Sequence, residues 1–177
     1  MRKLMLLVSV FLLTTGCDDN DDVKDDVIRL NLEDAVARYD QPYVLDIDHN
    51  GDSEFVFTTL LVADDLGDHL QFRIVSRHDH AVIGHDDRVD ALDPGKTIVA
   101  DDQFDPDVSV LVVKTTTNEG TEWPGPWNDT QNKYAGIRFR LHEQRYYGWI
   151  RLSFDRSAEE LILHDMGYGR PGIVTGK

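Results

Sequence analysis

The sequence predicts an all-β fold, an antiparallel β-sandwich of the jelly-roll-like kind in a single domain, and three observations support it. No long segment has the 3.6-residue apolar period of a helix. Residues 69–77 alternate cleanly, and their apolar members fall on one face: Leu70, Phe72 and Ile74. Short apolar runs recur between turn signals such as the Asp-Pro-Gly at 93–95, which is typical of sandwiches and jelly rolls.

Strands are expected along most of the chain after residue 26. The run at 55–63 is apolar on both faces, so we expect it in the centre of its sheet. Residues 31–38 break the pattern, because Asn31 suits a helix N-cap and one or two helical turns fit there. Residues 77–107 are rich in turn signals and predict hairpins and loops. The expected strands are 27–32, 43–46, 55–63, 69–77, 108–114, 134–142, 144–154 and 161–166.

The hairpin formed by 134–142 and 144–154 is the clearest local signal. Side chains alternate across a strand, so its residues divide into two faces. The face toward the core contains Ile137, Phe139, Leu141, Ile150, Leu152 and Phe154. The opposite face contains Arg138, Arg140, Trp149 and Arg151, which predicts a cationic strip.

The first sixteen residues have the pattern of a secretory signal. Arg2 and Lys3 precede an apolar run over 4–13, which is too short to cross about 30 Å of hydrocarbon. The ending Leu13-Thr-Thr-Gly-Cys17 resembles the lipobox of bacterial lipoproteins, which implies lipid attachment at Cys17, the one cysteine of the chain. Acyl chains on that residue would anchor the protein stably in a lipid bilayer. We therefore expect a palmitate-bearing lipoprotein of the cell envelope, with the choice between inner and outer leaflet left open.

Residues 17–26 read as the lipidated cysteine followed by an acidic tether, and 27–177 as the folded domain. The run after Cys17 is dominated by aspartate and has almost nothing to bury, so we expect it to stay extended and solvated. The whole chain carries a formal net charge of −15, which makes nucleic acid a poor partner.

An acidic loop before the strand at 55–63 is the strongest candidate site. Its oxygen-bearing residues recur at alternate positions, and Gly51 permits a sharp turn between them. Phe57 stands where an EF-hand requires a bidentate glutamate, so a loop between strands fits better than a helix–loop–helix. The spacing resembles the calcium loops of integrin-type propeller blades, dockerins and thrombospondin repeats. We expect a structural Ca²⁺ held by Asp46, Asp48, Asn50, Asp52 and Glu54.

A second group of possible metal ligands lies between His78 and Asp87. It contains His78, His80, His85 and Asp86, and imidazole with carboxylate suits Zn²⁺. Its spacing matches no hydrolase signature, and an exposed polar hairpin has the same composition. A metal-dependent hydrolase using this cluster is therefore the alternative function.

Five segments, in their order along the chain, resemble a diffuse group of uncharacterised secreted or surface bacterial proteins. They are the acidic loop at 46–55, Gly125-Pro-Trp127, Tyr134-Ala-Gly-Ile-Arg-Phe139, Tyr146-Tyr-Gly-Trp-Ile-Arg-Leu-Ser153 and Gly167-Tyr-Gly-Arg-Pro-Gly172. The hallmark of that group is a YYGWVRLS-type strand ahead of a YAY…PG ending. The resemblance implies a surface-attached β domain and assigns no activity.

The expected function is that of a binding or structural module and not of an enzyme. The chain has no Gly-x-Ser-x-Gly elbow and no Gly-rich phosphate loop after a strand. Trp123 and Trp127, stiffened by neighbouring prolines, suit sugar stacking, and the strip of Arg138, Arg140, Trp149 and Arg151 suits a sulfated or carboxylated glycan. The competing interpretation is that the tryptophans pack on the core and the arginines pair with aspartates.

Overall fold

The computed structural model describes residues 27–177, which form an all-β fold, so the predicted fold class is confirmed. The expected lipobox, Cys17 and the acidic tether lie outside the described residues. No helix in residues 27–177 is long and apolar enough to cross a membrane. The strands are β1 (Ile28–Ala37), β2 (Tyr43–Leu45), β3 (Phe55–Asp64), β4 (Gly67–Ser76), β5 (Ala81–His85), β6 (Arg88–Val89), β7 (Thr97–Ile98), β8 (Phe104–Pro106), β9 (Val108–Thr117), β10 (Gly120–Glu122), β11 (Lys133–Leu141), β12 (Gln144–Asp155), β13 (Glu160–Gly169) and β14 (Ile173–Val174).

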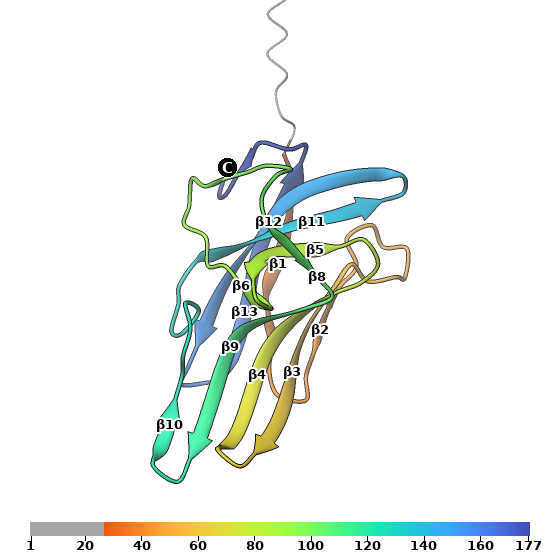
Figure 1. The fold of residues 1–177 in the computed structure, drawn as a ribbon. Coiled ribbons are helices and arrows are strands. Elements are labelled where there is room, and N and C mark those ends of the chain that lie inside the picture. The colour runs from red at the N-terminus through yellow and green to blue at the C-terminus, as the bar shows by residue number, and fades with distance from the viewer. Residues whose placement is uncertain (1–26) are drawn as a thin grey trace, which may run out of the picture.

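A 12-stranded sheet folds so that its two halves face each other (Figure 1). The order along it is β1-β13-β12-β11-β5-β6-β9-β4-β3-β2, with β8 beside β5 and β10 beside β9. All pairings in it are antiparallel except the single parallel bridge between β6 and β9. The short strands β5 and β6 make the corner where one half passes into the other.

The main core lies between the two halves and is built from the apolar face of each. Phe72 of β4 meets Phe154 of β12 edge to face, with ring centroids 4.9 Å apart. Phe55 of β3 meets Phe139 of β11 in the same way at 6.2 Å. Edge-to-face aromatic pairs add stability beyond the area they bury. The core faces predicted for 69–77 and for the long hairpin are thus the faces that meet.

A smaller core covers the other face of β11 and β12. The two-stranded sheet of β14 and β7 lies over that face, and Trp149 and Tyr134 pack edge to face beneath it at 5.2 Å. Trp149 is fully buried, so its predicted place in an exposed strip is wrong. The alternation was assigned correctly, but the strand pattern does not reveal that a second layer covers this face.

The predicted helix at 31–38 is wrong, because this segment belongs to β1. Strand β1 pairs with β13, and the register shifts between Asn31 and Ala35. Glu33 and Asp34 take up the extra length in left-handed conformations with φ of 57° and 53°. The Asn31 side chain accepts the Glu33 N–H at 3.0 Å, so the expected cap residue instead shapes a β-bulge.

Strand β3 was predicted to lie in the centre of its sheet, but only its first residues have a strand on each side. It pairs with β4 over its whole length, but β2 pairs only with Phe55–Phe57. Before β2 the chain turns back on itself, where Arg38 and Gln41 exchange backbone hydrogen bonds, so β2 does not continue beside the rest of β3. The second half of β3 is therefore an edge, and its apolar side chains remain exposed.

Candidate metal centre

The acidic loop connects β2 to β3 as predicted. Leu45 and Phe55 are directly paired, so the two ends of the loop lie side by side. The structure brings together Asp46, Asp48 and Glu54, and one carboxylate oxygen from each lies within 4.8 Å of the others. In residues 27–177 this is the one group of three or more acidic, histidine or cysteine side chains close enough to share an ion.

Backbone N–H groups hold the loop around the Asp46 carboxylate. Asp46 Oδ1 accepts the N–H of Asn50 at 3.2 Å, and Asp46 Oδ2 accepts the N–H of Gly51 at 2.9 Å. Two left-handed residues permit this winding: His49 with φ of 58° and Gly51 with φ of 95°. The loop conformation thus points the side chains of Asp46 and Asp48 to one side.

Glu54 is the buried member of the cluster, with 3% of its surface exposed. Its Oε2 accepts the backbone N–H of Ile47 at 2.7 Å. Burial raises the pKa of Glu54, and the nearby charges of Asp48 and Asp46 raise it further, while its backbone hydrogen bonds act the other way. Three carboxylates gathered at such a place repel one another when ionised, so a cation there relieves the repulsion.

The other two predicted ligands are Asn50 and Asp52, of which Asp52 is expected to offer its backbone carbonyl. The Asn50 side chain donates to Asp48 Oδ2 at 3.0 Å and accepts the Asp52 N–H at 2.7 Å, so both ends of its amide are engaged within the loop. The Asp52 side chain is exposed. The carboxylate oxygens of the remaining three are hard ligands of the kind Ca²⁺ takes, and Ca²⁺ sites complete their shells with backbone carbonyls and water.

The structure does not bring the His78–Asp87 group together. His78 and His80 precede β5, whereas His85 ends it and Asp86 follows it. The extended strand between His80 and His85 holds the two pairs about 16 Å apart. His80 is buried and accepts the Arg140 N–H at 3.3 Å, and burial lowers its pKa. The alternative hydrolase site therefore has no common centre for a metal.

The predicted glycan surface is not assembled either. Trp127 is 0% exposed, and its Nε1–H donates to the Val89 carbonyl at 2.9 Å, so it offers no face to a sugar. Trp123 is partly buried against Phe154, with ring centroids 5.4 Å apart. These side chains follow the competing interpretation, in which the loop packs its tryptophans against the core.

The arginines of the strip pair with acids and with an aromatic ring. Arg151 makes a two-point contact with Asp165, at 2.9 Å for each bond. Arg140 contacts the exposed acids Asp79 and Glu143 at 3.2 and 3.1 Å. Arg138 lies over the ring of Phe104, 4.8 Å from its centroid. Arg151 and Arg140 are thus paired with acids, whereas Arg138 has no acidic partner among residues 27–177.

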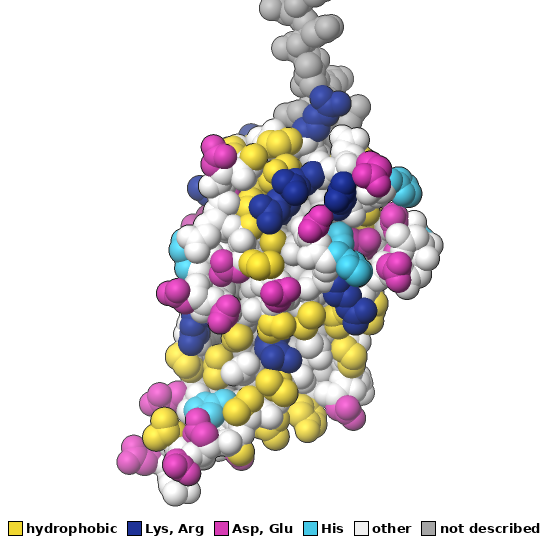
Figure 2. Space-filling view, turned by 45° about the vertical axis from the view of Figure 1, so that its right-hand side comes forward, with side chains coloured by type: hydrophobic (Ala, Val, Ile, Leu, Met, Phe, Trp, Pro, Cys, Tyr) yellow, Lys and Arg dark blue, Asp and Glu magenta, His cyan; other side chains and the backbone are white. Residues whose placement is uncertain are grey.

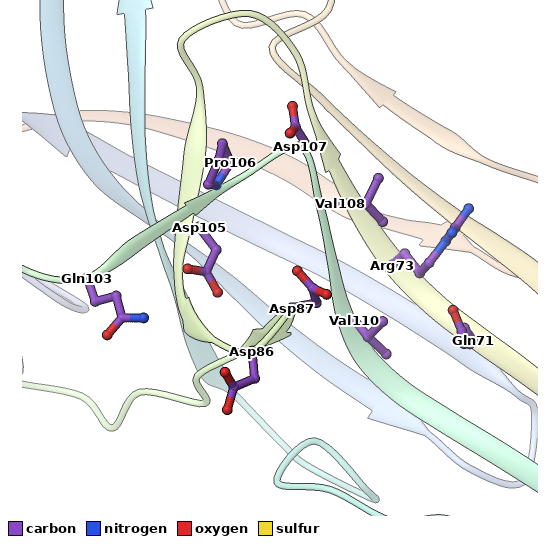
Figure 3. A pocket seen from close by; sticks show the side chains of 10 residues that line it. All are labelled: Gln71, Arg73, Asp86, Asp87, Gln103, Asp105, Pro106, Asp107, Val108 and Val110. Carbon is purple, nitrogen blue, oxygen red and sulfur yellow. The ribbon is translucent and has the colours of Figure 1, made fainter.

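An open pocket of about 690 Å³ lies where β4, β5, β8 and β9 meet (Figure 3). Asp87 and Asp105 lean toward each other across it, and Asp86 lies at its lower edge. No aromatic side chain lines it. No three of its carboxylates come close enough to share one ion, and it has no aromatic stacking platform.

A hydrogen-bonded chain of Ser153, His164 and Asp34 was missed by the sequence reasoning. Ser153 Oγ lies 2.7 Å from His164 Nε2, and His164 Nδ1 lies 2.5 Å from Asp34 Oδ1. The order of groups is that of a serine-hydrolase triad. The three come from β12, β13 and β1, and their spacing in the sequence gives no signal.

The burial of Ser153 argues against a catalytic role for this hydrogen-bonded group of three side chains. Ser153 is 1% exposed, and its Oγ also accepts the backbone N–H of Asn132 at 3.0 Å. A nucleophile has to reach a substrate carbonyl, and this hydroxyl is covered and engaged on both sides. The chain instead ties β1, β13 and β12 to the loop before β11.

Comparison with known proteins gives no relative from which a role can be transferred. No family model, no curated protein and no solved structure matches the chain.

Proposed function

We propose that this protein is a calcium-stabilised β-sandwich that serves as a binding or structural module of the cell envelope, anchored by lipid on Cys17. The observation that carries the calcium part is the convergence of Asp46, Asp48 and Glu54 oxygens within 4.8 Å at the junction of β2 and β3. A glycan surface is not part of the proposal, because the tryptophans meant to form it are buried or packed on the core.

The role of the ion is to hold the β2–β3 junction. Strand β2 has three residues and forms one end of the large sheet, so its own pairing is weak. The Glu54 carbonyl accepts the N–H of Arg77 at 3.3 Å, which links the same junction to the end of β4. An ion bound only by the folded loop therefore stabilises the whole edge of this half of the sandwich.

The anchor part of the proposal is supported by the sequence of the first 26 residues. A signal-like apolar run ends in the lipobox-like Leu13-Thr-Thr-Gly-Cys17, and a run rich in aspartate follows. Outside the cytoplasm calcium modules work at dissociation constants of about 10⁻⁴–10⁻³ M, a range that a cluster of three carboxylates with water suits.

The calcium part is tested by thermal unfolding of EDTA-stripped protein titrated with CaCl₂. When the free calcium concentration is 100 times the dissociation constant, binding adds about 2.7 kcal/mol to the free energy of unfolding. That raises Tm by about 5–10 °C in a domain of this size. The variant Asp46→Asn/Asp48→Asn should lose the shift, and Asp101→Asn, an exposed acid elsewhere, should keep it. An unchanged Tm in the wild type overturns the calcium site.

The anchor is tested by metabolic labelling with radioactive palmitate and by membrane fractionation. The wild type should carry label and sediment with membranes, whereas Cys17→Ser should carry none and appear in the soluble fraction. Equal labelling of the two proteins overturns the anchor and leaves the calcium site unaffected.

A further inference from the structure

One edge of the large sheet is open along the second half of β3. Strand β2 pairs only with Phe55–Phe57, so the outer edge of residues 58–64 has no strand beside it in the described chain. Figure 1 shows β3 and β4 continuing below β2. Unpaired backbone N–H and C=O groups on such an edge are ready to hydrogen-bond with another extended chain.

The open edge lacks the features that usually protect an edge strand. Residues 58–64 read Thr-Thr-Leu-Leu-Val-Ala-Asp and contain no lysine, arginine, proline or glycine. Their pairing with β4 is regular and has no bulge. Natural edges are usually blocked by a bulge, a proline or an inward charge. This edge is therefore suited to pairing.

Apolar side chains are exposed on both faces of the open edge. Leu60 and Val62 point to the outer face, and Leu61, which is 50% exposed, points to the inner face beside Tyr39. Figure 2 shows hydrophobic side chains gathered over the lower part of the molecule. A strand added here would bury apolar surface on each face as well as satisfy the backbone.

We propose that the open edge of β3 pairs with the same edge of a second copy of this chain, antiparallel and centred on Leu61. In that register Leu61 faces its own symmetry mate, Leu60 faces Val62, and Thr59 faces Ala63. The one charge, Asp64, faces Thr58, so no two carboxylates meet. The interface is isologous and closes with two copies.

The self-complementary pattern is what selects a second copy as the occupant. Apolar residues meet apolar residues at every central position, and the acid at one end meets a neutral residue. Each copy carries a formal net charge of −15, so long-range repulsion opposes the contact. Screening at about 1 M salt shortens the Debye length from about 10 Å to about 3 Å. Association should therefore strengthen as salt rises.

The test is sedimentation velocity of the Cys17→Ser protein over a range of concentrations at low and high salt. This background removes the one cysteine and with it any acyl chain. Leu61→Lys places two ammonium groups opposite each other and should raise the dimer dissociation constant by roughly tenfold or more. The matched control is Leu66→Lys, which alters a leucine that is 75% exposed in the β3–β4 turn, outside the paired segment, and should leave the constant unchanged.

The register is tested with single cysteines in the same background. Only a residue that faces its own mate can form a disulfide between two identical variants, because paired Cα atoms in such strands lie about 4.5–5.5 Å apart. Leu61→Cys should crosslink on mild oxidation, and Leu66→Cys should not. A protein that stays monomeric at every salt concentration, or equal loss of dimer in Leu61→Lys and Leu66→Lys, overturns the proposal.

Discussion

The Glu54 carboxylate accepts the backbone N–H of Ile47 at 2.7 Å, and this bond places a buried acid against the ionisable side chains of its own loop. The bond closes the acidic loop across the β2–β3 junction. It also fixes Glu54 where burial, together with the charges of Asp48 and Asp46, raises its pKa.

A calcium-free protein should lose stability as pH rises through the range of Glu54. The folded state holds the Glu54 proton more tightly than the unfolded chain, so its contribution is complete below the ordinary glutamate pKa of about 4.3 and disappears as pH passes the raised value. Urea unfolding in EDTA from pH 4 upward, at about half-unit steps, measures this.

Two controls isolate the effect of Glu54. Glu54→Gln cannot ionise and should flatten that part of the pH dependence. Saturating calcium stabilises the ionised form and should also remove it. A slope that is the same in Glu54→Gln as in the wild type would show that other groups cause it.

The buried position of Trp149 gives a second prediction. A Cβ added at Gly167 would lie 2.6 Å from Cζ2 of the Trp149 ring, which has no room to move beneath β7 and β14. Gly167→Ala should therefore cost about 1–3 kcal/mol in the free energy of unfolding. Adding Trp149→Phe, which removes the clashing part of the ring, should make the double variant less destabilised than the two single costs combined. Strict additivity in chemical denaturation would contradict the contact.

Local patterns in the sequence predicted what depends on neighbours along the chain. Alternation located the core faces of β4, β11 and β12, because each of these strands packs one face on the main core. The grouping of carboxylates in the acidic loop was also predictable, since Asp46, Asp48 and Glu54 lie within nine residues of one another. Asn50 was assigned by spacing, but its side-chain amide donates to Asp48 and accepts the Asp52 N–H within the loop.

Features that depend on distant segments were not predictable. The burial of Trp149 needs β7 and β14, of which one precedes Trp149 in the sequence and the other follows it at a distance. The bulge at Glu33 and Asp34 needs the pairing of β1 with β13, and local preference there suggested a helix. The open edge of β3 depends on how far β2 extends, and a strand that is apolar on both faces looks central in isolation.

The hydrogen bonds among Ser153, His164 and Asp34 should stabilise the fold by linking β12, β13 and β1. Ser153→Ala leaves the Asn132 N–H and His164 Nε2 without their partner, at a cost of about 1–3 kcal/mol in the free energy of unfolding. Ser157→Ala, in the exposed turn between β12 and β13, is the matched control and should be near neutral. A fluorophosphonate probe should not label the folded protein. Labelling that Ser153→Ala abolishes would instead identify a nucleophile.

The two arginine pairs on β11 and β12 should differ in their contribution to stability. Arg151 forms two parallel bonds to Asp165, and both side chains are 29% exposed, so Arg151→Ala should cost about 1–3 kcal/mol. Arg140 pairs with Asp79 and Glu143, whose side chains are 63% and 96% exposed, so Arg140→Ala should cost about 0–1 kcal/mol. Urea unfolding measures both. Repeating it at about 1 M salt should shrink the Arg140 effect more than the Arg151 effect, because salt screens exposed pairs most. Equal costs at low salt would mean that the geometry of the Arg151 pair adds nothing to its stability.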